Sequence, residues 1–182
     1  MSPYGSSYQG SRALVLGASG FIGRWIARGL SQAGAEVIAA VRDPDEGARI
    51  LDRWGVRAMI EPVDLTRAGA VSALIETTRP AIVFNAAGYG VDRSERDKDL
   101  LLRLNRDLVA EIATALRDLP RERWAGARLV HCGSALEYGS LDGDLAEDGP
   151  SPQPTDPYGR SKLDGTVALR RIAEAADRKS VV

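Results

Sequence analysis

A glycine-rich turn between two different apolar patterns constrains this chain more than any other feature. Residues 13–16 are apolar throughout and predict a short buried strand. After the turn, four large apolar side chains follow at helical spacing: Ile22, Trp25, Ile26 and Leu30. A strand, a glycine turn and a helix in this order form the context in which backbone amides bind phosphate groups. The pattern favours a dinucleotide site over the alternative, an ordinary glycine-rich turn that holds no ligand.

Each glycine of the turn Gly17-Ala-Ser-Gly20-Phe-Ile-Gly23 has its own predicted role. Gly17 allows the sharp turn that leaves the strand, and Gly20 removes a Cβ atom that would block a pyrophosphate. Gly23 lets the following helix pack closely on the sheet. The first amides of the helix then face the phosphates, and the positive end of the helix dipole adds to the attraction.

Runs of aliphatic residues alternate with helical patterns along the rest of the chain. The expected strands span residues 13–16, 37–41, 56–60, 81–84 and 128–132. The expected helices run to about residue 33, over 45–54, from a cap at Thr66 to before Pro80, over 100–119, and from Pro157 toward residue 177. This alternation predicts an α/β fold with a doubly wound parallel sheet of the Rossmann type, which binds ligands at the carboxyl ends of its strands.

The chain of 182 residues is long enough for one domain with a substantial core. We expect residues 1–10 to form a flexible arm and residues 11–182 to form an NAD(P)-binding domain. The 24 basic and 25 acidic side chains nearly balance, which disfavours nucleic acids and anionic membranes as partners. A single cysteine, no long apolar run and no secretory leader make the cytoplasm the expected location.

Five candidate residues follow the expected strands: Gly17, Arg42, Asp64, Ala86 and Ser134. In a parallel sheet they lie along one edge. The second strand ends where a Rossmann fold binds the cofactor ribose, and the guanidinium of Arg42 suits the 2′-phosphate of NADP. NADP is therefore favoured over NAD. The alternatives are that Asp43 bonds the ribose and that Arg42 is a solvated turn residue.

Tyr158 and Lys162 stand four residues apart on the last expected helix and so share one of its faces. An isolated tyrosine hydroxyl has a pKa of about 10, and a nearby ammonium group lowers that pKa because it favours the phenolate. The pair can then act as acid or base on a carbonyl or alcohol oxygen. Such pairs are common on solvated helices, but Ser134, at the end of the fifth strand, adds a hydroxyl able to bond the same oxygen.

Two other features of the sequence have structural explanations. His131 and Cys132 are the only histidine and cysteine, so we expect no metal site and assign both to a buried strand end. Trp25, Trp54 and Trp124 are expected to pack rather than to stack on bases, because no basic stripe accompanies them.

Five motifs resemble, in order and over nearly the whole chain, those of the extended short-chain dehydrogenase/reductase family, the NAD-dependent epimerase/dehydratase group. They are Gly17-Ala-Ser-Gly-Phe-Ile-Gly23, Val63-Asp64-Leu65, Asn85-Ala-Ala-Gly88, Ser134-Ala-Leu-Glu-Tyr138-Gly139 and Tyr158-Gly-Arg-Ser-Lys162. The resemblance implies a catalytic triad of Ser134, Tyr158 and Lys162. With Arg42 added, the expected cofactor-binding residues are Gly17, Ser19, Gly20, Phe21, Ile22, Gly23, Arg42, Asp64, Leu65, Ala86, Ala87, Gly88, Asn105, Tyr158 and Lys162. Asn105 matches a family position that orders the active site, and a plain polar helix residue is its equal alternative.

The resemblance also implies a reaction: hydride transfer between NADP or NAD and a sugar carbon or ketone, with a nucleotide sugar as the expected substrate. Family 4,6-dehydratases carry an Asp-Glu pair after the catalytic hydroxyl, where this chain has Ala135 and Leu136, so dehydration is disfavoured. Arg42 favours a reductase over an epimerase, because a reductase consumes free NADPH.

Family members usually continue for another domain's length, which supplies the substrate-binding lobe, whereas this sequence stops where a sixth strand would begin. A fragment, a shortened version and a degenerate gene product are all open explanations. So are a non-catalytic dinucleotide-binding module and an interaction protein with a vestigial site. The helices over 100–119 and from Pro157 resemble the family's dimer surface, so a homodimer is expected. The alternative is that the leucines over 100–119 only cover the sheet.

Overall fold

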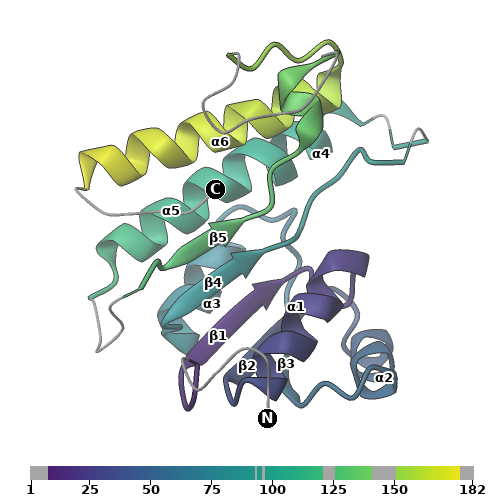
Figure 1. Ribbon diagram of the computed structural model, residues 1–182, viewed down its shortest axis with the longest axis vertical. Coiled ribbons are helices and arrows are strands. Elements are labelled where there is room, and N and C mark those ends of the chain that lie inside the picture. The colour runs from purple at the N-terminus through teal and green to yellow at the C-terminus, as the bar shows by residue number, and fades with distance from the viewer. Residues whose placement is uncertain (1–7, 93, 96, 121–125, 141–150, 177–182) are drawn as a thin grey trace.

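Five parallel strands form one sheet in the order β3-β2-β1-β4-β5 (Figure 1). The computed structural model describes residues 8–92, 94–95, 97–120, 126–140 and 151–176. The strands are β1 (Arg12–Leu16), β2 (Glu36–Val41), β3 (Ala58–Pro62), β4 (Ile82–Asn85) and β5 (Leu129–His131). The chain winds outward from β1 through β2 to β3, then returns to β4 on the other side of β1. Because the strands are parallel, all five carboxyl ends lie at one edge of the sheet. The strand order reverses at β1, which places a topological switch point at the centre of that edge.

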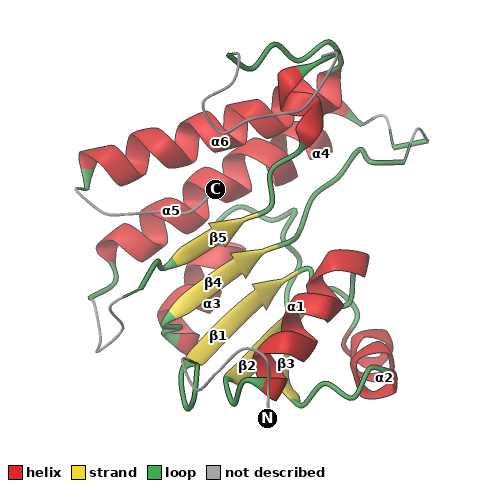
Figure 2. Ribbon diagram, in the orientation of Figure 1, coloured by secondary structure: helices red, strands yellow, loops and turns green. Residues whose placement is uncertain are grey.

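Helices cover both faces of the sheet (Figure 2). One face carries α1 (Phe21–Gln32) and α2 (Pro44–Arg53). The other carries α3 (Ala70–Thr78), α5 (Leu108–Asp118) and α6 (Pro157–Ala175). A short α4 (Lys98–Leu102) and a π-helical segment η1 (Arg103–Asp107) lead into α5, and a 3₁₀ turn η2 (Ala135–Tyr138) lies between β5 and α6. This architecture confirms the predicted doubly wound fold.

The central strand β1 supplies side chains to two separate cores. Leu14 and Leu16 pack with α3, α5 and α6, whereas Ala13 and Val15 pack with α1 and α2. All four are completely buried. Successive strand residues point to opposite faces, so a strand covered on both sides must be apolar at every position. This requirement explains the unbroken apolar run before the glycine turn.

Aspartates are the N-cap residues of two helices that start at the carboxyl edge, α2 and α6. Asp43 accepts a 2.9 Å hydrogen bond from the amide of Glu46 and caps α2. Asp156 accepts one of 2.9 Å from the amide of Gly159 and caps α6, whose first residue is Pro157. The predicted start of the last helix is therefore confirmed.

The predicted third strand is present with shifted bounds, and the predicted cap of the third helix is wrong. The strand spans 58–62 rather than 56–60, and its last residue, Pro62, pairs with Val41. Because β3 is an edge strand of the described sheet, proline costs no hydrogen bond on its outer side. Thr66 caps no helix: its amide and hydroxyl bond Asp64 at 3.0 and 2.6 Å, and α3 begins after Gly69, whose φ is 81°.

The predicted helix over 100–119 is correct in extent but not in geometry. The chain is helical over 98–118, yet residues 103–107 form a π turn that separates α4 from α5. The predicted stripe of leucines faces inward: Leu101, Leu108, Ile112 and Leu116 are buried within this single chain.

The two tryptophans in the described chain pack together, as predicted: the rings of Trp25 and Trp54 meet edge to face with centroids 4.5 Å apart. Within the predicted arm, Tyr8 lies against Phe84, and Gly10 bonds the carbonyl of Gly34. Residues 1–7, Trp124, residues 141–150 and the start of the expected sixth strand lie outside the described residues.

Candidate active site

The glycine turn folds tightly against the chain that follows β4. Gly17 has a φ of 71°, and a Cβ added there would lie 3.1 Å from the carbonyl oxygen of Ala86 and from the amide of Ala87. A Cβ added at Gly23 would overlap the carbonyl oxygen of Gly17. Only glycine fits these two positions without displacing backbone. The Gly23 contact packs the first turn of α1 against the glycine turn, so α1 begins close to the end of β1.

The N-terminus of α1 is open to an anion. Its first residues follow Gly20, which provides no side-chain cap, and no acidic residue lies in the first turn. Phe21 and Ile22 are exposed, and Ser19 is half-buried. Uncapped amides at a helix N-terminus, next to a turn without side chains, form a cradle that fits a phosphate group. The residues present therefore fit a dinucleotide cofactor.

Two charged residues follow β2 and β3 at the carboxyl edge of the sheet. Arg42 comes directly after β2 and is exposed, while the neighbouring Asp43 is occupied as the cap of α2. Asp64 follows β3, and hydrogen bonds from the Thr66 side chain and amide lower its pKa, with further contributions from the charges of Arg67 and Arg42. The carboxylate of Asp64 thus stays ionised within electrostatic reach of Arg42.

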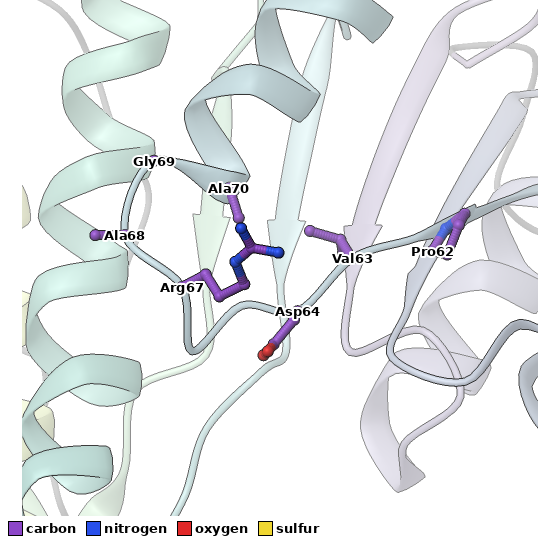
Figure 3. A pocket seen from close by; sticks show the side chains of 7 residues that line it. All are labelled: Pro62, Val63, Asp64, Arg67, Ala68, Gly69 and Ala70. Carbon is purple, nitrogen blue, oxygen red and sulfur yellow. The ribbon is translucent and has the colours of Figure 1, made fainter.

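A groove of about 500 Å³ runs beside Asp64, between the end of β3 and the start of α3 (Figure 3). It is lined by Pro62, Val63, Asp64, Arg67, Ala68, Gly69 and Ala70. Arg103 holds the loop in place, because its guanidinium bonds the carbonyls of Thr66 and Arg67 at 3.1 and 2.8 Å. The predicted cofactor-binding residues Asp64 and Leu65 therefore lie on a loop that Arg103 of η1 holds in place.

The structure brings Tyr158 and Ser134 together. Tyr158 is in the first turn of α6, and Ser134 is the N-cap of η2. Burial raises the pKa of the Tyr158 hydroxyl, a hydrogen bond with the Ser134 side chain lowers it, and the negative charges of Glu137, Asp156 and Glu95 raise it, for a net increase. The expected lowering of this pKa by Lys162 does not occur, because the ammonium is directed elsewhere.

Lys162 lies one helical turn after Tyr158 and is only 4% exposed. Its Nζ donates a 2.6 Å hydrogen bond to the carbonyl oxygen of Cys132, directly after β5. Burial lowers the pKa of Lys162, against the opposing influence of Glu137 and the Cys132 thiol. The ammonium thus ties α6 to the end of β5 and stays at the carboxyl edge.

Asn105 joins three elements around the site from a fully buried position in η1. Its Nδ2 donates to the carbonyl of Tyr89 at 2.8 Å and to the Ser161 hydroxyl at 3.0 Å, and its Oδ1 accepts from the amide of Tyr89 at 3.0 Å. Gly88 lies against the same side-chain oxygen. Asn105 therefore orders the loop after β4 and the start of α6.

His131 and Asn85 form a buried pair at the ends of β5 and β4. The Nδ2 of Asn85 lies 3.1 Å from the Nδ1 of His131, and the Asn85 Oδ1 accepts from the amide of Ala87 at 3.2 Å. Burial, helped by the charge of Lys162, lowers the pKa of His131 to about 3. The imidazole is neutral, as expected of a buried strand end. Among the described residues, histidine, cysteine and acidic side chains nowhere gather in a group of three able to hold a metal ion.

Sequence reasoning missed two residues of this region, Asn85 and Glu137. Asn85 lies at a strand end and opens one of the five motifs, but neither feature indicates its contact with His131. Glu137 gives a signal, because Ser134 followed three residues later by a glutamate is the capping-box pattern, and the structure contains that box.

A doubly wound sheet with a glycine turn after its central strand defines this chain as a Rossmann-type protein of the dinucleotide-binding class. The family model for the NAD-dependent epimerase/dehydratase family matches residues 13–182. The chain belongs to this family, as the five motifs predicted.

Three known proteins illustrate what the chain is similar to. It is 32% identical over 160 residues to a probable dTDP-4,6-dihydroxy-2-methyloxan-3-one 4-ketoreductase of Streptomyces antibioticus, covering 87% of this chain and 46% of the relative. It is 32% identical over 184 residues to a dTDP-6-deoxy-L-talose 4-dehydrogenase (NAD(P)(+)) of Kitasatospora kifunensis, covering 94% and 51%. The fold matches UDP-glucuronic acid 4-epimerase from Bacillus cereus in complex with NAD, with a TM-score of 0.73 at 19% identity, over 92% of this chain and 54% of the other.

The chain spans about half the length of the curated relatives that it matches. None of the helices within the described ranges is long and apolar enough to cross a membrane.

Proposed function

We propose that this chain is the cofactor-binding and proton-transferring part of an oxidoreductase that acts on a nucleotide-linked sugar. The observation that carries the proposal is the meeting of Ser134, Tyr158 and Lys162 at the edge that also holds the glycine turn. Two relatives at 32% identity are named for ketoreduction or dehydrogenation of dTDP-linked sugars, which supports the reaction class.

The cofactor would be held along the carboxyl edge. The amides after Gly20 take its pyrophosphate, Asp64 and Leu65 flank its adenine, and Ala86, Ala87 and Gly88 line it near the centre of the sheet. When bound, a nicotinamide cofactor supplies or accepts the hydride. The protein then has to orient the substrate carbon and manage one proton on its oxygen.

Tyr158 is the group proposed to move that proton. Ser134 bonds the same oxygen, and Lys162, held at the end of β5, holds the cofactor ribose. The raised pKa of Tyr158 means that its hydroxyl is fully protonated at neutral pH, a form able to donate a proton to a developing alkoxide. This protonation state suits reduction of a ketone, and together with Arg42 it favours a reductase over an epimerase.

NADP is the proposed cofactor, with NAD as the alternative. Asp43 is engaged in capping α2, so Arg42 is the side chain directly after β2 that is left to contact the ribose. A guanidinium there pairs with a 2′-phosphate and has no comparable contact with a 2′-hydroxyl. The relative from Kitasatospora kifunensis is named as using either cofactor.

Calorimetric titration of the chain with NADP and NAD tests the cofactor proposal. We expect both to bind, NADP more tightly, and absence of binding by either would refute it. For the chemistry, Tyr158→Phe in a protein active on a dTDP-linked ketosugar should lower kcat by about 100-fold or more, with cofactor affinity almost unchanged. An active Tyr158→Phe variant would exclude Tyr158 as the proton donor. Binding without turnover in the unaltered protein would favour the non-catalytic module.

We also propose a homodimer, although the predicted leucine stripe is buried within one chain. Any dimer surface on α5 and α6 must therefore use their outward-facing residues. Equilibrium sedimentation at micromolar concentration tests this proposal, and a mass of one chain throughout would contradict it.

A further inference from the structure

A buried carboxylate lies beneath the turn that carries Ser134. Glu137 is only 5% exposed, although it belongs to a short 3₁₀ turn between β5 and α6. Its Oε1 accepts a 2.9 Å hydrogen bond from the amide of Ser134. A Cβ at Gly133 would lie 2.9 Å from the same oxygen, so the carboxylate lies directly against this backbone. Glutamate is almost never this buried unless a specific partner compensates the loss of water.

The Glu137 carboxylate also lies within electrostatic reach of both functional side chains of α6, Tyr158 and Lys162. Close packing accounts for this proximity. A Cβ added at Gly159 of α6 would overlap the carbonyl oxygen of Leu136, so the helix lies directly against the 3₁₀ turn. One short turn therefore presents the Ser134 hydroxyl and a buried negative charge to the same helix.

The Lys162 ammonium needs such a charge. It is almost fully buried, and the acceptor of its hydrogen bond, the Cys132 carbonyl, is neutral. Two other titratable groups interact with Lys162. The half-buried Cys132 thiol raises the pKa of Lys162, and the charge of Lys162 lowers the pKa of the neutral His131. Among the described residues, Glu137 is thus the carboxylate that compensates the buried ammonium. A buried charge without compensation would tend to lose its proton.

We propose that Glu137 is a positioning residue of the active site, which fixes the Ser134 turn through the Ser134 amide and presents a buried negative charge to the helix that carries Tyr158 and Lys162. This inference rests on the proposed function, because it assigns to Glu137 an action on the three residues proposed to contact substrate and cofactor. The same negative charge disfavours the phenolate of Tyr158, along with Asp156 and Glu95. Glu137 therefore maintains the resting site with lysine charged and tyrosine neutral.

Glu137→Gln separates the two parts of this role. The glutamine amide oxygen can still accept from the Ser134 amide, but the negative charge is gone. The titration midpoint of Lys162, followed by NMR of ¹³Cε-labelled lysine and identified with Lys162→Met, should move to lower pH. The midpoint of Tyr158, identified with Tyr158→Phe, should also move to lower pH. Hydrogen-exchange protection of the Ser134 amide should be retained.

Glu76→Gln provides the matched control, because Glu76 is an exposed glutamate on α3 and should leave both midpoints in place. Unchanged Lys162 and Tyr158 midpoints in Glu137→Gln would overturn the proposal. If that variant does not fold, Glu137→Asp retains the charge on a shorter side chain. It should keep the Lys162 midpoint near the wild-type value while the Ser134 amide loses protection, and a shifted midpoint with protection intact would also overturn the proposal.

These titrations require no cofactor. Failure of NADP and NAD to bind would refute the proposed function without changing the expected midpoints, whereas unchanged midpoints with normal cofactor binding would refute only the role of Glu137.

Discussion

The carbonyl oxygen of Asn105 occupies the space that a Cβ at position 165 would need. Gly165 is in the interior of α6, where alanine is normally favoured over glycine by roughly 0.5–1 kcal/mol. Here the helix is pressed against backbone of η1, and backbone cannot move aside as a flexible side chain can. The contact brings the helix that carries Tyr158 and Lys162 against the segment that holds Asn105.

Gly165→Ala should therefore destabilise the fold despite its better helix propensity. Overpacking of this kind typically costs about 1–3 kcal/mol. Urea denaturation followed by circular dichroism measures the change in the free energy of unfolding. A variant as stable as the wild type, or more stable, would show that α6 and η1 are not in the close contact described.

Gly20→Val should abolish binding of both cofactors while leaving the fold intact. A Cβ at Gly20 meets only the carbonyl oxygen of Gly17, at 3.1 Å, and the residue is exposed with an extended backbone, φ −69° and ψ 173°. The branched side chain would instead fill the phosphate cradle. Calorimetry for binding and a thermal melt for stability test this pair of outcomes. Gly23→Val is the contrasting variant, since its Cβ would overlap backbone and should unfold the protein. Normal NADP binding by Gly20→Val would remove the cradle assignment.

Arg42→Ala should weaken NADP binding by about 1.5–3 kcal/mol, that is about 10- to 150-fold, and leave NAD affinity almost unchanged. The lost interaction is a charged hydrogen bond to the 2′-phosphate, which NAD lacks. Arg49→Ala is a suitable control, because Arg49 is an exposed arginine on α2 of the same charge. An equal loss for both cofactors would instead assign Arg42 to the pyrophosphate or to the fold.

The stability of the folded chain should fall as the pH decreases from 6.5 toward 4.5. The pKa of His131 is about 3 in the folded protein against an ordinary value of 6.5, so between these values the unfolded chain binds a proton that the folded chain does not. Stability is therefore lost with falling pH, by about 2 kcal/mol over this range. His131 is the only histidine, and the two aspartates with lowered pKa, Asp64 and Asp92, titrate below the range.

His131→Asn should remove most of this slope, whatever its effect on stability at neutral pH. Denaturation at a series of pH values in both proteins measures the difference. Parallel pH profiles for the wild type and the variant would mean that the imidazole is not held neutral by burial.

The alternation of apolar and helical patterns was sufficient to predict the sheet, because a strand covered on both faces must be apolar at each position. It was not sufficient for the ends of elements on the periphery. The third strand was expected to end before Pro62, and only the position of β3 at an edge of the described sheet makes proline acceptable within it. Threonine is a common helix cap, but the amide and hydroxyl of Thr66 both donate hydrogen bonds to the side chain of Asp64, two residues earlier.

The residues of the candidate site that directly follow strands, such as Gly17, Arg42 and Ser134, could be predicted, because the ends of parallel strands lie at one edge of the sheet. Contacts that depend on the direction of a side chain could not be predicted. The spacing of Tyr158 and Lys162 places them on one helical face, but it does not reveal that the ammonium turns to the Cys132 carbonyl. Nor does any local pattern show that a carboxylate at Glu137 is buried beside them.

The π turn at 103–107 is the place where this helix can change its length. A π turn holds more residues than an α turn, so it accommodates one extra residue locally, and α4 and α5 keep the relative phase of one continuous α-helix. Deleting one residue here would restore regular α-helical winding and leave the buried stripe on α5 facing the sheet. Deleting one residue inside α5 would instead turn the part of α5 before the deletion relative to the part after it by about 100°.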